Sequence, residues 1–420
     1  MTARLTTLPN GFRIVTEAMP GFESAAVGVW VLAGARNEAK SENGIAHFLE
    51  HMAFKGTGRR SAVQIAEAIE DVGGHINAYT SREATAYYAR VLRDDVPLAV
   101  DVLADILRNS ALDPNEMNVE RGVILQEIGL AHDTPDDIIF DWLQEQAYPD
   151  HPLGRSILGA EAGVRGFARP DLEGFVDRHY RPGHMVLAAA GAIDHDALVR
   201  LAGDLFGDMT PAPVAEAPRA RFRGGEMRSE KSLEQAHFAL AFEGPSCAHE
   251  DIYASQVYAT ALGGSMSSRL FQELRERRGL CYTIFAQAGA YADTGMTTIY
   301  AGTSPEAAGA LAEVTIDELK RAAEDMSEAE IARGRAQMKA GLLMGLESPA
   351  DRAERLARMI QVWGHVPAVE DVIARIDAVD VAGVRRVAES IVARAPAALA
   401  LYGPVSKVPD LARLDARRAA

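Results

Sequence analysis

The stretch NGIAHFLEHMAFKG, residues 43–56, combines the pattern of a buried helix with a cluster of ionisable side chains. Its apolar residues recur at i, i+3, i+4, i+7 and i+8, which is the spacing of one helix face; they are Ile45, Phe48, Leu49, Met52 and Ala53. At about 100° per residue, His47, Glu50 and His51 fall together on the opposite side. Asn43 is the predicted N-cap. This stretch therefore predicts a helix that packs one face in a core and displays three ionisable groups on the other.

The spacing of these groups suits a metal. Two histidines at i and i+4 present their imidazoles from one side of a helix, as two ligands of a tetrahedral zinc ion must. Glu50, between His47 and His51, could take a proton from an attacking water without being a ligand itself. The pattern predicts a hydrolytic zinc site, and a solvated helix face is the alternative.

A second predicted helix offers a third ligand. Asp113 is its expected N-cap, Pro114 occupies the first helical position, and Glu116 completes a capping box. Glu120 and Glu127 are seven positions apart, so they lie within about 20° of each other on a partly apolar face. A carboxylate on such a face needs a partner, because burying it unpaired is costly. The alternative is that both are half-exposed and paired with arginines.

Composition limits the class of protein. The chain has 420 residues, 48% of them hydrophobic, which is enough for two domains with their own cores. A formal net charge of −16 argues against nucleic-acid binding and favours cationic partners. Cys247 and Cys281 are too few for a disulfide framework. No membrane span, signal peptide or transit peptide is recognised, so a cytoplasmic protein is expected.

The two halves of the chain have similar patterns, at a nearly constant offset of about 210 residues. Apolar strands end at Gly34 and Gly244, and similar helical and strand-like segments follow each. We predict an N-terminal zinc-bearing domain at 1–209, a Pro-rich linker at 210–222 and a metal-free repeat at 223–420. Each repeat is expected to be an α+β unit, a mostly antiparallel sheet with helices packed on one face. Chance similarity between two ordinary domains is the alternative.

The HxxEH pattern of residues 47–51, followed by Glu127, resembles the inverted zinc motif of the inverzincin metallopeptidases, the family of pitrilysin, insulin-degrading enzyme and mitochondrial processing peptidase. The resemblance spans the chain through three further segments, residues 73–78, 153–159 and 180–185. The length matches the short bacterial branch, whose members are half the size of pitrilysins and pair as homodimers. The fold that this implies is one half of a clam-like peptidase chamber.

The resemblance assigns roles to five residues. His47, His51 and Glu127 become the ligands of one Zn²⁺ per chain, and Glu50 becomes the general base that activates a zinc-bound water. Glu120 becomes the residue that orients a ligand histidine. The implied function is a zinc-dependent endopeptidase that hydrolyses unfolded or extended peptides.

Arg275 and Tyr282 resemble the family's R-x6-Y element, which binds the substrate backbone and the oxyanion. The alternative is a charged amphipathic helix that runs into a strand. Because one chain carries both this pair and the zinc motif, a homodimer is expected rather than a heterodimer that divides them.

Four more residues are candidates for contact with a peptide. Asn77 and Ala78 lie in residues 76–80, where an extended peptide is expected to add as a strand. Asp137 and Asp141 match acidic positions that bind a substrate arginine in processing peptidases. For these aspartates the alternative is the solvated start of a helix.

An inactive scaffold, or the partner subunit of a processing-peptidase-like complex, is the competing function. Such members are expected to lose zinc ligands or the base. This chain retains His47, Glu50, His51 and Glu127, so the peptidase interpretation is favoured.

Overall fold

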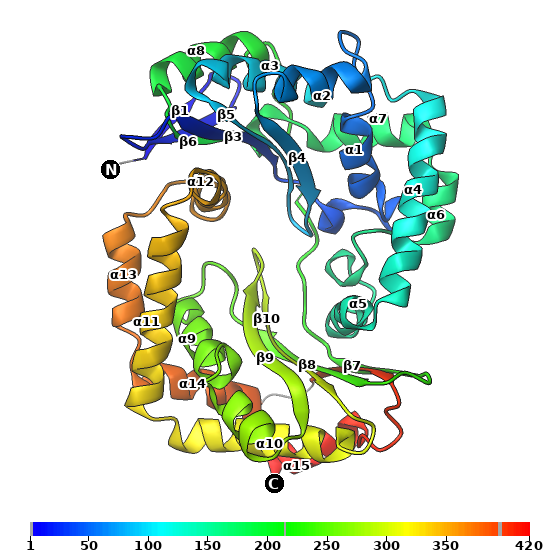
Figure 1. Ribbon diagram of the computed structural model, residues 1–420, viewed down its shortest axis with the longest axis vertical. Helices are drawn as coiled ribbons and strands as arrows, with labels where there is room; N and C mark the ends of the chain where they lie inside the picture. The colour runs from blue at the N-terminus through cyan, green and yellow to red at the C-terminus, as the bar shows by residue number, and fades with distance from the viewer. Residues whose placement is uncertain (1–2, 214–215, 394–396) are drawn as a thin grey trace. The chain divides into compact units, whose positions relative to one another are not determined.

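Two β-sheets organise the chain, described here in a computed structural model at residues 3–213, 216–393 and 397–420 (Figure 1). The chain divides into two compact units with one sheet each. The first contains the described residues within Met1–Gly129, Arg155–Pro218 and Leu343–Ala368. The second contains those within Leu130–Gly154, Arg219–Leu342 and Val369–Ala420.

The sheet of the first unit has the strand order β1-β2-β6-β3-β5-β4. Its strands are β1 (Arg4–Thr7), β2 (Arg13–Ala18), β3 (Ser24–Val31), β4 (His75–Thr80), β5 (Thr85–Leu92) and β6 (Met185–Gly191). Neighbours are antiparallel except β2 and β6, which are parallel. Strand β3 is buried from Ala25 to Val31, the continuous burial of a strand that is covered on both faces.

Most helices of this unit pack on one face of the sheet, where Val27 and Val29 share a core with Phe48 and Leu103. These helices are α1 (Ile45–Ala53), α2 (Ala62–Glu70), α3 (Val96–Arg108), α4 (Pro114–Asp133), α6 (Glu161–Gly166), α7 (Arg169–His179) and α8 (His195–Phe206). Short 3₁₀ turns lie at Ala35–Asn37, Lys40–Glu42, Arg93–Asp95 and Pro182–His184. The opposite face packs against α12 (Pro349–Trp363).

The sheet of the second unit has the order β7-β11-β8-β10-β9. Its strands are β7 (Gly225–Glu230), β8 (Ala236–Gly244), β9 (Cys281–Ala290), β10 (Gly295–Thr303) and β11 (Ala398–Gly403). One face carries helices that include α9 (Ile252–Gly263), α10 (Ala308–Asp325) and α14 (Val381–Ala393), and the other face packs against α5 (Pro135–Ala147). The remaining segments are a 3₁₀ turn at Pro152–Gly154, a π-helix at Phe271–Arg277, α11 (Glu328–Gly345), α13 (Val369–Asp377) and α15 (Leu411–Ala419).

The two sheets have the same topology, which confirms the expected duplicated α+β architecture. The order β2-β6-β3-β5-β4 repeats as β7-β11-β8-β10-β9, with a single parallel pair at the same place in each sheet. Similar patterns at a nearly constant offset predicted this repeat, and each copy encloses its own hydrophobic core.

The structure adds one helix on the second face of each sheet. Leu356 of α12 packs against Trp30 and Val186 in the first unit, and Leu143 of α5 packs against Ala239 and Ala400 in the second. The second face of each sheet is apolar, so another element must pack on it to exclude water. As a result both units are discontinuous in sequence. The division between Pro218 and Arg219 falls within 210–222, of which residues 214–215 lie outside the described residues.

In the part of the chain that is described, no helix combines the length and the apolar composition needed to cross a membrane.

Candidate metal centre

Helix α1 carries the two histidines, and its start differs from the sequence prediction. Gly44 is the N-cap, with φ +97°, and Asn43 is not. The glycine is required by a close approach, since a Cβ on Gly44 would lie 2.8 Å from the Cα of Gly159. The Asn43 side chain instead donates to the Glu38 carboxylate (3.1 Å) and to the Ser156 carbonyl (2.9 Å).

Burial on α1 extends beyond the apolar stripe. His47, placed by periodicity on the opposite side, is only 9% exposed. Strand β4 packs against α1, and Thr80 Oγ1 donates to Glu50 Oε2 at 2.6 Å. The helix periodicity gives the correct side for His47 but cannot show that another element covers that side.

Three donor atoms converge between α1 and α4. Glu127 Oε2 lies 3.6 Å from His47 Nε2 and 3.5 Å from His51 Nε2. The ligand atoms of His47, His51 and Glu127 all lie within 4.8 Å of one another. Among the described residues this is the single group of three or more histidine, cysteine or acidic side chains with such spacing.

Glu120 holds His51 from the side away from this cluster. Its carboxylate is 4% exposed and accepts from His51 Nδ1 (2.9 Å) and from Lys55 Nζ (2.7 Å). Burial raises the pKa of Glu120, but the hydrogen bonds from Lys55 and His51 outweigh it and leave the pKa below its ordinary value. An ionised carboxylate only accepts, so Nδ1 carries the hydrogen. In neutral His51 the Nε2 lone pair therefore faces Glu127.

His47 completes the donor set as a neutral imidazole. Burial and the nearby charge of His51 lower its pKa to about 4. Two imidazole nitrogens and a carboxylate oxygen within 4.8 Å of one another are a donor set that zinc accepts. The residues present therefore fit a zinc ion.

Glu50 lies beside the cluster and is not among its donor atoms. Burial raises its pKa above the ordinary value; the Thr80 hydrogen bond and the charge of His51 oppose the shift, and the charge of Glu127 adds to it. The sequence did not single out Thr80 or Lys55. Lys55 could have been found, since it follows His51 by one helical turn.

The strand predicted to receive a peptide, β4, is the edge of its sheet. Asn77 is exposed and Ala78 is buried, and the Ala78 N–H donates to Asn77 Oδ1 at 2.8 Å. Thr80, at the end of the same strand, is the residue that bonds Glu50.

Arg275 and Tyr282 meet within the second unit. The Arg275 guanidinium lies 5.0 Å from the centre of the Tyr282 ring and 4.5 Å from that of Phe271. Tyr282 is 76% exposed. The structure thus brings the two residues together on a π-helix and the following strand, β9, rather than on a regular charged helix.

Asp137 and Asp141 lie on α5, also in the second unit. Burial and then the charges of Asp141 and Asp136 raise the pKa of Asp137. The two predicted carboxylates are therefore near enough to influence each other.

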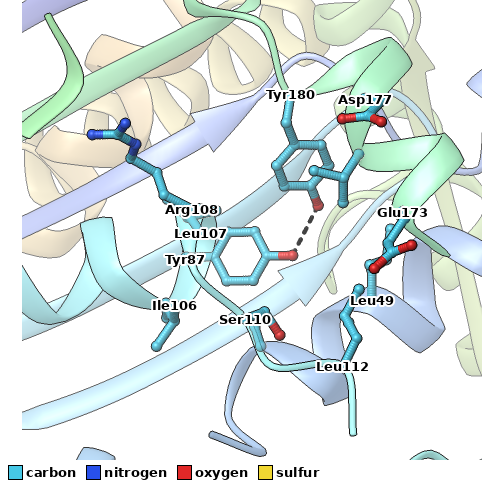
Figure 2. Close-up of a pocket in the computed structure, with 12 residues that line it drawn as sticks. Leu49, Tyr87, Ile106, Leu107, Arg108, Ser110, Leu112, Glu173, Asp177 and Tyr180 are labelled. Carbon is cyan, nitrogen blue, oxygen red and sulfur yellow. Dashed lines mark hydrogen bonds between the residues drawn. The ribbon is translucent and has the colours of Figure 1, made fainter. Parts of the chain in front are cut away.

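A cavity of about 330 Å³ lies on the apolar side of α1 and is lined by Leu49 and Ala53 rather than by His47 and His51. Figure 2 shows the Tyr87 and Tyr180 hydroxyls directed at each other in this cavity, 2.9 Å apart. None of the residues that line this cavity belongs to the donor cluster of His47, His51 and Glu127.

Comparisons with known proteins show the family of the chain. Residues 13–161 match the family model for insulinase (peptidase family M16), and residues 166–338 match that for the peptidase M16 inactive domain. A zinc protease of Streptomyces coelicolor is 40% identical over 96% of this chain and 90% of its own length. A probable mitochondrial-processing peptidase subunit beta of Arabidopsis thaliana is 39% identical over 97% of this chain and 79% of its own length.

The fold is also found in solved structures. A protease from Helicobacter pylori superposes with a TM-score of 0.88 at 22% identity, covering 96% of this chain and 99% of that one. With two family models in tandem and relatives at about 40% identity along nearly its whole length, the chain belongs to peptidase family M16, together with bacterial zinc proteases and the beta subunit of a mitochondrial processing peptidase.

Proposed function

We propose that this chain is a zinc-dependent endopeptidase that holds one Zn²⁺ through His47, His51 and Glu127. The observation that carries the proposal is the convergence of two imidazole nitrogens and a carboxylate, with His51 held by Glu120 behind it. Zinc bound there supplies a Lewis acid for peptide hydrolysis.

Glu50 is the proposed general base. Thr80 bonds its Oε2, which limits rotation of the carboxylate beside the cluster. Glu50 takes a proton from the attacking water and delivers it to the amine that leaves the broken peptide bond. Neither step requires Glu50 to bind the metal.

Strand β4 is the proposed peptide-binding edge. A peptide that adds as a strand beside Asn77 and Ala78 gains main-chain hydrogen bonds that do not depend on its side chains. Because Thr80 joins this strand to Glu50, such a peptide lies along the element that orients the base. This supports cleavage within extended chains with little sequence demand.

Residues of the second unit are proposed to serve the same reaction. Exposed Tyr282, stacked on Arg275, offers a hydroxyl donor to the oxyanion that develops on the scissile carbonyl. Asp137 and Asp141 are proposed to bind a substrate arginine, and a homodimer is the proposed assembly.

The test is a digestion of denatured protein with and without a chelator, in which mass spectrometry reads the cleavage sites. The parent should cut within chains, and chelation should stop it. Glu50→Gln should keep zinc and lose nearly all hydrolysis, because the amide has the same size but accepts no proton. Glu70→Gln, an exposed site on α2, is the matched control and should keep full activity. Full turnover by zinc-loaded Glu50→Gln would refute the mechanism.

A further inference from the structure

A buried carboxylate that the proposed reaction does not use lies at the start of the metal-binding helix. Glu38 is 2% exposed and follows the Ala35–Asn37 turn. Its Oε1 accepts from the Ala46 N–H at 3.0 Å, and its Oε2 accepts from the Gly44 N–H at 2.9 Å. Asn43 adds its side-chain donor to Oε2 at 3.1 Å. All three donors belong to the turn that begins α1.

This contact replaces the missing local cap. The first N–H groups of a helix lack partners within the helix, and the glycine at the N-cap of α1 has no side chain to satisfy them. A negative charge at this end also interacts favourably with the helix dipole. Burial raises the pKa of Glu38 to about 7, against the opposing hydrogen bonds of Ala46, Asn43 and Gly44 and the charge of Arg155.

The loop at 155–159 holds the same turn from the other side. The Arg155 guanidinium donates to the backbone carbonyl of Glu38, and Asn43 donates to the carbonyl of Ser156. Gly159, at φ +83°, packs so closely that an added Cβ would lie 2.5 Å from the Asn43 carbonyl oxygen. Residues 155–159 of the segment 153–159, to which the sequence assigned no function, therefore fix the start of α1.

The two histidines differ in how they are held. His51 Nδ1 is bonded by Glu120, whereas His47 Nδ1 is buried and no group of the described residues hydrogen-bonds to it. The position of the His47 imidazole therefore depends on packing and on the backbone of the first turn. Glu38 fixes that backbone at Ala46, the residue directly before His47.

We propose that Glu38 is a positioning residue for the metal centre: by holding the first turn of α1 it sets the place of His47, as Glu120 does for His51. This inference rests on the proposed role of His47 as a metal ligand.

The test measures zinc affinity separately from stability. Glu38→Gln keeps the size of the side chain but replaces one carboxylate oxygen with an NH₂ group. A single oxygen then remains to accept from the three donors, and any donor on the other side faces the NH₂ group. The zinc Kd, measured by competition with a chromophoric chelator, should rise about 10–100-fold, as for loss of other groups that support metal ligands. Glu17→Gln is the matched control. Glu17 is a 6% exposed carboxylate on β2, and Arg352 of α12 is its ion-pair partner.

Both variants should lower the apo-protein Tm, but only Glu38→Gln should weaken zinc. Should Glu38→Gln fail to fold, Asn43→Ala decides. It removes the Asn43 hydrogen bonds to the Glu38 carboxylate and to the Ser156 carbonyl, and the zinc Kd is expected to rise about 2–10-fold. The positioning role is overturned if Glu38→Gln, or Asn43→Ala where Glu38→Gln does not fold, binds zinc with a Kd within twofold of the parent. It is also overturned if Glu17→Gln raises the Kd equally. Neither result affects the assignment of the metal ligands. A parent that binds no zinc, or His47→Ala with the parent's Kd, overturns the metal assignment and this inference with it.

Discussion

Glu120 offers the sharpest test of how the proposed metal centre is supported. One carboxylate oxygen accepts from His51 Nδ1 at 2.9 Å and the other lies 2.7 Å from Lys55 Nζ, in a site that is almost closed to solvent. Glu120→Gln preserves the volume but has a single acceptor oxygen. One of the two donors must then face an NH₂ group, and the charge-assisted bond to His51 is lost.

The size of the effect follows from that bond. A hydrogen bond to a charged group contributes about 1.5–3 kcal/mol. Each 1.4 kcal/mol corresponds to a factor of ten in Kd, so zinc binding by Glu120→Gln should weaken about 10–100-fold. Glu127→Gln, which removes a proposed ligand, should weaken it further.

The assay is zinc competition with a chelator at one fixed pH, together with metal content after dialysis. Lys55→Met is the matched control, because it removes the other partner of Glu120 and leaves the His51 bond in place. The reasoning is refuted if Glu120→Gln binds zinc within twofold of the parent, or if Lys55→Met weakens binding equally.

Three further expectations concern the second unit. Tyr282→Phe should lower kcat by about 10²–10³ without changing zinc content, and an unchanged kcat/KM would leave the Tyr282–Arg275 contact a structural one. Asp137→Asn/Asp141→Asn should abolish a preference for Arg over Lys in peptide substrates at high salt; if the preference persists, these are surface charges. Burial raises the pKa of Glu330, but hydrogen bonds that include those from Arg269 outweigh it and lower the pKa from 4.5 to about 2. The stability that the lowered pKa of Glu330 contributes is present above pH 4.5 and is lost as pH falls towards 2. Glu330→Gln should therefore flatten the acid-unfolding curve between these pH values, and an unchanged slope would contradict this expectation.

Local patterns were enough to predict helices α1 and α4, whereas similar patterns at a nearly constant offset predicted the repeat. The i, i+4 spacing put His47 and His51 on one side of α1. Asp113 was also correctly placed before the start of α4, where its side chain accepts from the backbone N–H groups of Asn115 and Glu116. Such features depend on residues within one or two turns of each other, so a single sequence contains them. The meeting of these helices at Glu127 came from family resemblance, because periodicity does not show which helices become neighbours.

Contacts between distant segments required the tertiary structure. Asn43 was predicted to cap α1, but Glu38 holds that turn because the backbone of Gly159 approaches too closely for any N-cap residue but glycine. Thr80 reaches Glu50 from another strand. The covering of each sheet by α5 or α12 likewise joins segments far apart in the chain. Helix and strand periods specify which side of an element is apolar, whereas the element that covers it is chosen by packing of the whole chain.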